Sequence, residues 1–280
     1  MIQNNKIYPC LWFDSKAEEA SAYYKEILPH SQVLLKTPMV TIFELLNKKI
    51  MGLNGGPMFQ LNQSISFFVT NNTVEETKNL WNKLIQGGSA MMDISSYPWS
   101  ECYGWLKDKY GMTWQISIKG KKEEEPSLKP ALLFANEKFG RAEEAILTFS
   151  KIFPDYKLNH MEKYPEDSPY ANKVMYSEIS LNGMDFIFMD GPGVHDFDFN
   201  EALSFVIDCE TQDEIDYYWD HLTKGGKESM CGWLKDSFGI SWQIVPTIIG
   251  SLMTDPERAP RIMNEVMKMK KLDIKRMLEA

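Results

Sequence analysis

The chain has 280 residues, 44% of them hydrophobic and 25% charged, which is typical of a globular protein with room for two domains. Its formal charge of −9 argues against a basic surface for nucleic acids or anionic membranes, because such surfaces gather Lys and Arg. No apolar run approaches the roughly 18 residues of a membrane span, the first residues lack a signal-peptide pattern, and the 4 cysteines form no C-x-x-C pair. We therefore expect a cytoplasmic protein with free thiols.

The first part of the chain predicts a strand, a helix and three more strands. Ile7–Phe13 has the composition of a strand, and Ser15-Lys16-Ala17-Glu18 has the Ser-x-x-Glu pattern of a helix capping box. Apolar residues three to four apart continue the helix until Pro29 ends it. Three β-like segments follow, near residues 32–37, 39–46 and 49–53.

The same order of elements then begins again. Ile65–Thr70 predicts a strand, Thr73 and Glu76 form a second capping-box pattern, and a helix runs to Gly87-Gly88 before three strands that end at Ile118. The predicted unit is thus strand, helix, strand, strand, strand. It occurs twice in the first half of the chain and, on the evidence of the repeats, twice in the second.

An internal repeat divides the chain into two domains. The phrase WLKDKYGMTWQI at Trp105–Ile116 returns as WLKDSFGISWQI at Trp233–Ile244, and PCLWF near the start returns as PALLF. Only the first copy contains the segment Met92–Glu101, which we predict to be a loop. We predict an α+β fold with a first domain at 1–119, a linker at 120–128, a second domain at 129–246 and a C-terminal helical tail at 247–280.

Each domain is expected to enclose a cup between its two units, because each helix covers only one face of its strands. Alternation places Tyr8, Cys10 and Trp12 on the cup side of the first strand. The predicted partners on the closing strand of the same domain are Thr113, Gln115 and Ser117. The second cup is expected to be lined by Lys129, Ala131, Leu133, Ser241, Gln243 and Val245. The Met92–Glu101 segment, with Tyr97 and Trp99, favours the first cup as the binding site.

The paired units, the D-x-x-G-x-x-W-Q ending and the tail MKKLDI resemble the PhnB-like branch of the vicinal oxygen chelate superfamily. This branch often carries the label 3-demethylubiquinone-9 3-methyltransferase, and the superfamily includes glyoxalase I and the bleomycin resistance proteins. The resemblance covers nearly the whole chain. It implies tandem glyoxalase/bleomycin-resistance-like domains, each built from two βαβββ units.

The same resemblance implies a divalent metal held by His and Glu, but the residues depart from that pattern. Gln115 and Gln243 stand where the last glutamate ligand is expected, and Tyr8 and Lys129 stand where a histidine is expected. Amides bind hard divalent cations far less well than carboxylates do. None of the 4 histidines pairs with another at ligand spacing. We therefore predict no metal and no cofactor, and the missing G-x-G-x-x-G turn argues against a common adenosylmethionine site.

Three functions remain open from the sequence. The first is metal-free binding of a small, partly apolar molecule in a cup, with no nucleic-acid or membrane partner, by a monomer that pairs internally or by a homodimer. The second is a metal-dependent lyase, isomerase or resistance enzyme that uses Gln115 or Gln243 with Glu44 or Glu178. The third is an interaction protein whose cups are filled by its own side chains. The candidate ligand-binding residues are Tyr8, Cys10, Trp12, Trp99, Trp105, Thr113, Gln115, Trp233 and Gln243.

Overall fold

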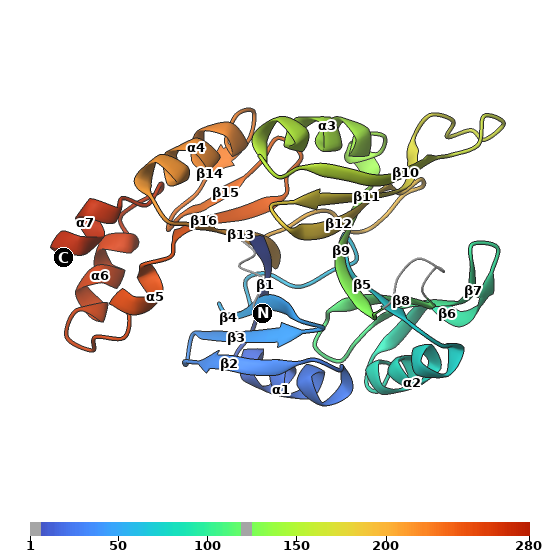
Figure 1. Cartoon of the computed structure of the whole chain (residues 1–280), viewed down its shortest axis with the longest axis horizontal. Coiled ribbons are helices and arrows are strands. Elements are labelled where there is room, and N and C mark those ends of the chain that lie inside the picture. The colour runs from blue at the N-terminus through green and yellow to red at the C-terminus, as the bar shows by residue number, and fades with distance from the viewer. Residues whose placement is uncertain (1–6, 119–124) are drawn as a thin grey trace.

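A computed structural model describes residues 7–118 and 125–280. Four long helices and two eight-stranded sheets make up the body of the protein (Figure 1). The helices are α1 (Ala17–Ile27), α2 (Val74–Leu84), α3 (Ala142–Ile152) and α4 (Gln212–Leu222). None of the helices formed by the described residues combines the length and hydrophobicity that a membrane span requires.

Sheet A has the strand order β14-β15-β16-β13-β1-β4-β3-β2. Its first-repeat strands are β1 (Ile7–Phe13), β2 (Gln32–Lys36), β3 (Val40–Leu45) and β4 (Lys48–Asn54). Its second-repeat strands are β13 (Leu203–Cys209), β14 (Lys227–Glu228), β15 (Trp233–Lys235) and β16 (Ser241–Pro246).

Sheet B has the order β10-β11-β12-β9-β5-β8-β7-β6. Its first-repeat strands are β5 (Ile65–Asn71), β6 (Ser89–Tyr97), β7 (Ser100–Lys107) and β8 (Thr113–Ile118). Its second-repeat strands are β9 (Ser127–Phe134), β10 (Lys157–Lys163), β11 (Val174–Leu181) and β12 (Met184–Asp190).

Each sheet is therefore shared between the two sequence repeats. Antiparallel pairing of β1 with β13 joins the halves of sheet A, and pairing of β5 with β9 joins those of sheet B. The prediction that each repeat encloses its own cup is wrong. Tyr8 and Gln243 belong to one sheet, whereas Gln115 and Lys129 belong to the other.

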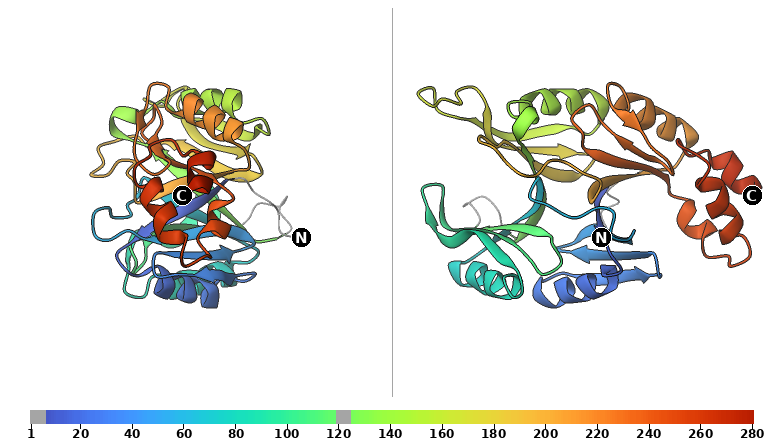
Figure 2. Two further views of the ribbon diagram at one scale, coloured as in Figure 1. Left: turned by 90° about the vertical axis from the view of Figure 1, so that its left-hand side faces the viewer. Right: turned by 180° about the vertical axis from the view of Figure 1, so that it is seen from behind.

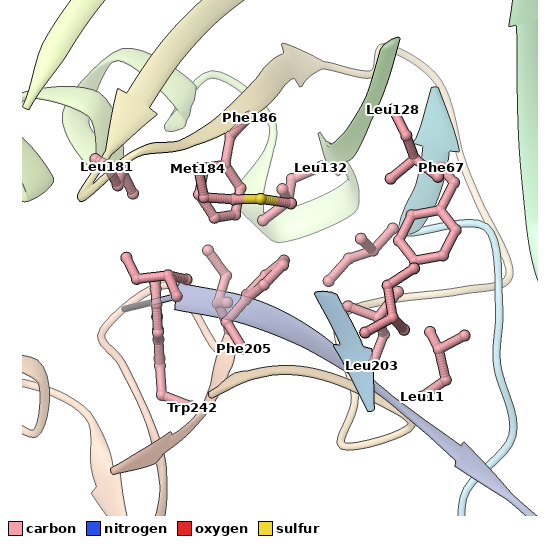
Figure 3. Close-up of a cluster of buried hydrophobic side chains, with 14 of the residues drawn as sticks. Leu11, Phe67, Leu128, Leu132, Leu181, Met184, Phe186, Leu203, Phe205 and Trp242 are labelled. Carbon is pink, nitrogen blue, oxygen red and sulfur yellow. The ribbon is translucent and has the colours of Figure 1, made fainter. Parts of the chain in front are cut away.

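Each sheet bends, so that its own first and last strands turn toward the same side of that sheet (Figures 1 and 2). The helices α1 and α4 pack on sheet A, and α2 and α3 pack on sheet B. We call the helix-bearing side of each sheet its back face and the opposite side its inner face. The back faces also meet each other: Leu11, Leu203 and Phe205 of sheet A face Leu132, Met184 and Phe186 of sheet B in the main core (Figure 3).

Local sequence signals explain some helix starts and not others. Thr73 and Glu76 form the predicted capping box at the start of α2. The predicted box at Ser15 is not formed, because Ser15 adopts a left-handed backbone with φ of 59° and Lys16 takes the cap position. The first free N–H of α1, that of Ala17, is instead bonded to Asn54 Oδ1 at 2.9 Å. A residue from β4 thus does the work expected of the local serine.

The two repeats differ most at the sheet ends. The Met92–Glu101 segment does not form a loop: it extends β6 and β7 to 9 and 8 residues. The matching strands of the second repeat, β14 and β15, have only 2 and 3 residues. Sheet B consequently ends in a tall hairpin where sheet A has a short edge.

The C-terminal tail forms three short helices, α5 (Ile249–Leu252), α6 (Ala259–Val266) and α7 (Ile274–Glu279). Their apolar side chains make a separate small core around Ile262, Leu272 and Met277. The segment between α6 and α7 lies beside the short edge of sheet A, where Met269 and Lys270 carbonyls accept from the N–H groups of Cys231 and Gly232.

Candidate functional site

The repeated phrase closes a tight turn with a buried aspartate. Asp108 accepts hydrogen bonds from Trp114 Nε1 at 2.8 Å and Tyr24 Oη at 2.7 Å, and from two backbone N–H groups of its own turn. Asp236 repeats this arrangement with Trp242 Nε1 at 2.9 Å. Gly111 and Gly239 have φ of 89° and 85°, which only glycine adopts without strain. The aspartate and glycine of the phrase are therefore architectural, as the sequence indicated.

The inner face of sheet A has an apolar centre. Tyr8, Cys10 and Val206 are buried there and form a small cluster separate from the main core. Gln243 lies beside them and donates from Nε2 to Ser204 Oγ at 2.9 Å. Burial raises the pKa of the Cys10 thiol to about 12, so this cysteine is not a nucleophile at neutral pH.

A charged pair borders this apolar centre. Asp208 accepts from Tyr8 Oη at 2.9 Å and from Lys49 Nζ at 3.0 Å. The ammonium of Lys49 also lies 3.7 Å from the centre of the Tyr8 ring. Burial and the neighbouring Asp208 carboxylate raise the pKa of Tyr8 well above its usual value, so the phenol stays neutral. At the end of β1, Trp12 packs edge-on against Phe59 and Trp233.

The inner face of sheet B is built around the second glutamine. Gln115 accepts from Tyr103 Oη at 2.8 Å and donates from Nε2 to Ser66 Oγ at 2.7 Å. Both ends of its amide are thus engaged by the protein. Thr113, on the same strand, is fully buried and donates to the Ile65 carbonyl at 3.3 Å.

A buried lysine lies at the centre of sheet B. Lys129 is 7% exposed and donates to Glu178 Oε2 at 3.1 Å. The other carboxylate oxygen of Glu178 accepts from Tyr176 Oη. A buried ammonium requires such a counter-charge, because desolvating a lone cation is costly. The pair holds the two charges in place and leaves the centre of the face electrically balanced.

A row of aromatic rings crosses the inner face of sheet B. Tyr97 and Trp99 stack at the tip of the β6–β7 hairpin with ring centres 5.0 Å apart, and both meet Tyr103 edge-on. Phe68 lies next to Tyr103 at 6.3 Å and next to Tyr176 at 6.4 Å. The row therefore runs from the first-repeat end of the sheet to the second-repeat end, past the Lys129–Glu178 pair.

The nine sequence-predicted site residues separate into two groups. Sheet A or its edge carries Tyr8, Cys10, Trp12, Trp233 and Gln243, and sheet B carries Trp99, Trp105, Thr113 and Gln115. The sequence did not single out Phe68, Tyr103 and Tyr176. Strand alternation places each of these rings on an inner face, but it does not show that they lie side by side. That follows only from the pairing of β5 with β9, which joins the two halves of sheet B.

The resemblance-implied metal does not fit the inner faces. The described residues contain no group of three or more His, Cys, Asp or Glu side chains that holds a metal ion. Gln115 is already bonded at both ends of its amide, and Lys129 places an ammonium where a ligand is expected. A cation there would face an ammonium and a neutral amide, which is the wrong donor chemistry for a hard divalent ion.

Two clefts lie next to the repeated turns. The larger, about 670 Å³, is lined by Trp12, Phe59, Lys107 and Tyr110 among others. The corresponding cleft of the second repeat, about 440 Å³, includes Lys138 and Arg141 in its wall. Arg141 donates to the Ser237 carbonyl at 3.3 Å, so side chains of the protein itself occupy part of this space.

Comparison with known proteins places the chain in a family. A family model described as 3-demethylubiquinone-9 3-methyltransferase matches residues 5–117 and 126–245. The PhnB protein of Bacillus cereus is 30% identical over 40% of this chain and 98% of its own, with a TM-score of 0.38. Glyoxalase I of Zea mays is 12% identical over 94% of this chain and 95% of its own, with a TM-score of 0.57. No curated protein matches the chain.

The likeness to the maize enzyme shows the tandem glyoxalase-like fold, and the predicted α+β class is confirmed. The family model covers both sequence repeats. The chain is thus a member of the 3-demethylubiquinone-9 3-methyltransferase family, whose model matches it twice in tandem.

Proposed function

We propose that this protein binds a small, partly apolar molecule on the inner face of sheet B without the help of a metal ion. The observation that carries the proposal is the row of aromatic rings from Trp99 to Tyr176. Aromatic side chains offer large flat apolar surfaces, and a few fixed polar groups among them orient a ligand.

Exposure supports this choice of face. Trp99 is 63% exposed at the hairpin tip, and Phe68 and Tyr176 are half-buried rather than sealed. An exposed stacked pair of aromatic rings costs solvation unless something covers it. Sheet A offers a weaker case, because its β14–β15 edge is short.

The internal network supports binding rather than metal chemistry. Gln115 is bonded to Tyr103 and Ser66, and Lys129 is bonded to Glu178, so these polar side chains are held in place by the protein. Because these groups are held by the protein, they position a ligand without needing an ion. We infer a cytoplasmic protein that pairs internally, since one chain completes both sheets by itself.

Thermal denaturation with a library of flat aromatic compounds tests the proposal. A ligand at one hundred times its Kd stabilises the folded state by about 2.7 kcal/mol, which is readily measured. Trp99→Ala should reduce the stabilisation, and the matched variant Trp12→Ala on sheet A should leave it unchanged. The absence of any stabilising compound, or an equal loss in both variants, would overturn the assignment.

Elemental analysis of the purified protein provides the second arm. We expect a metal content far below one ion per chain and no change in ligand binding after dialysis against a chelator. Stoichiometric zinc, nickel, iron or manganese that is required for binding would favour the metal-dependent alternative instead.

A further inference from the structure

An indole N–H on the inner face of sheet B has no hydrogen-bond acceptor in the part of the chain that the structure describes. The Nε1 atom of Trp105 is buried and has no partner among the described residues. By contrast, the buried indoles of Trp114 and Trp242 donate to aspartates at 2.8 and 2.9 Å. A buried donor that lacks an acceptor destabilises the folded protein, because it has lost its hydrogen bonds to water and gained none in return.

Trp105 lies on the same face as the aromatic row. A Cβ atom on the preceding residue, Gly104, would lie 2.5 Å from Trp81 of α2, which places that position against the helix on the back face. Neighbouring residues of a strand point to opposite sides. Trp105 therefore shares the inner face with Tyr103, two residues before it, and pairs across the sheet with Gln115.

No described side chain of this inner face accepts a hydrogen bond from the Trp105 indole. The Gln115 carbonyl oxygen, on the residue directly across from Trp105, already accepts from Tyr103 Oη. Lys129 and Tyr176 are donors, and both are directed at Glu178. The indole N–H therefore lacks an acceptor among the described residues.

The strand beside Trp105 is able to admit an acceptor group. β6 is the edge strand of sheet B, and its pairing with β7 has register shifts on both sides of Met92, the residue opposite Trp105. Irregular edge strands are held by fewer ladder bonds than regular ones, so a small displacement of β6 is cheap.

We propose that the ligand is a neutral, planar aromatic compound that bears a carbonyl oxygen, and that this oxygen accepts a hydrogen bond from Trp105 Nε1 while the ring lies against the aromatic row. The Lys129–Glu178 pair balances its own charge, which favours a neutral compound over an ion. This inference rests on the proposed function and adds the chemical class of the ligand.

Three bicyclic probes of similar size separate the contributions: naphthalene has no acceptor, coumarin carries a ring carbonyl, and N-methylquinolinium carries a positive charge. Isothermal titration of the full chain should give coumarin about tenfold tighter binding than naphthalene, since one added hydrogen bond contributes about 1.4 kcal/mol. N-methylquinolinium should bind no better than naphthalene.

Trp105→Phe keeps an aromatic ring and removes the N–H. The coumarin preference should disappear in this variant, while naphthalene binding changes less than about twofold. The matched control Trp233→Phe, at the equivalent position of the repeated phrase on sheet A, should keep the full preference. In the wild-type protein, the Trp105 indole ¹H resonance should move downfield with coumarin and not with naphthalene, which tests the bond without a substitution.

The outcomes distinguish this inference from the proposed function. Equal binding of coumarin and naphthalene, a preference that survives Trp105→Phe, or tighter binding of the cation would overturn the ligand class and leave binding on sheet B intact. Failure of all three probes to bind would count against both.

Discussion

Asp236 predicts an unusual pH dependence of stability. Its carboxylate is buried in the second repeated turn, and burial raises the pKa to about 6 from a usual value of 3.8. The folded protein therefore takes up a proton at Asp236 at a higher pH than the unfolded chain does. This group adds stability as the pH falls through about 6, which is opposite in sign to a salt-bridged carboxylate.

The size of the effect follows from the two pKa values. Between about pH 7.5 and about pH 5, uptake of this proton stabilises the folded state by about 1.4 kcal/mol. Asp236→Asn removes the titration and keeps a side-chain oxygen for Trp242 Nε1. The free-energy gap between wild type and Asp236→Asn should therefore widen in favour of wild type by about that amount.

Urea denaturation at several pH values measures this gap, and subtraction of the variant cancels the other titrating groups. Asp216→Asn is a control of opposite sign. A hydrogen bond from Lys271 lowers the pKa of Asp216, so the wild type should lose its advantage over that variant as the pH falls below about 5. A gap for Asp236→Asn that stays constant or narrows toward pH 5 would refute the buried, proton-accepting carboxylate.

Three further substitutions test the packing around the sites. Glu178→Gln should destabilise the protein by about 2 kcal/mol because it removes the counter-charge of Lys129, and the double variant with Lys129→Met should recover part of that loss in a urea double-mutant cycle. Gly226→Ala should cost more than about 3 kcal/mol, since a Cβ there would lie 2.1 Å from the Lys235 carbonyl oxygen, whereas Gly250→Ala, with open space around it, should stay within about 0.5 kcal/mol. Gln212→Ala should speed proteolysis of the tail, because the Gln212 side chain bonds both the Leu272 carbonyl at 3.1 Å and the Ile274 N–H at 2.9 Å; an unchanged cleavage rate would mean that the tail core alone holds it.

The sequence predicted the elements well because their signals are local. Strand alternation placed Leu11 on the back face and Cys10 on the inner face, as the two separate clusters show. The capping box at the start of α2 is likewise local, because Thr73 and Glu76 lie only three positions apart in the sequence. The predicted capping box at Ser15 was wrong because Asn54, and not Ser15, accepts the hydrogen bond from the Ala17 N–H. Asn54 lies in a strand far along the chain, so no local sequence pattern contains that contact.

The pairing of units was not predictable in the same way. All four units have the same order of elements, so the local sequence does not specify which unit supplies the strand that pairs with β1. Nothing in the local pattern of β5 distinguishes β9 from β1 as a partner. The candidate site inherited this error: the residues were placed on the correct face of each strand but assigned to the wrong companions.

The two copies of the repeated phrase have the same turn, although the inner faces of the two sheets differ. Each turn needs its own aspartate and tryptophan, because each must satisfy its own buried donors wherever its unit pairs. The position two residues before the first tryptophan of the phrase is under no such constraint: it is Tyr103 in sheet B, where it caps Gln115, and Cys231 in sheet A, where its N–H bonds the tail. The aspartate–tryptophan turn is therefore present in both copies, whereas Tyr103, which links the hairpin rings to Phe68, is present in only one. This asymmetry favours binding on a single inner face, that of sheet B.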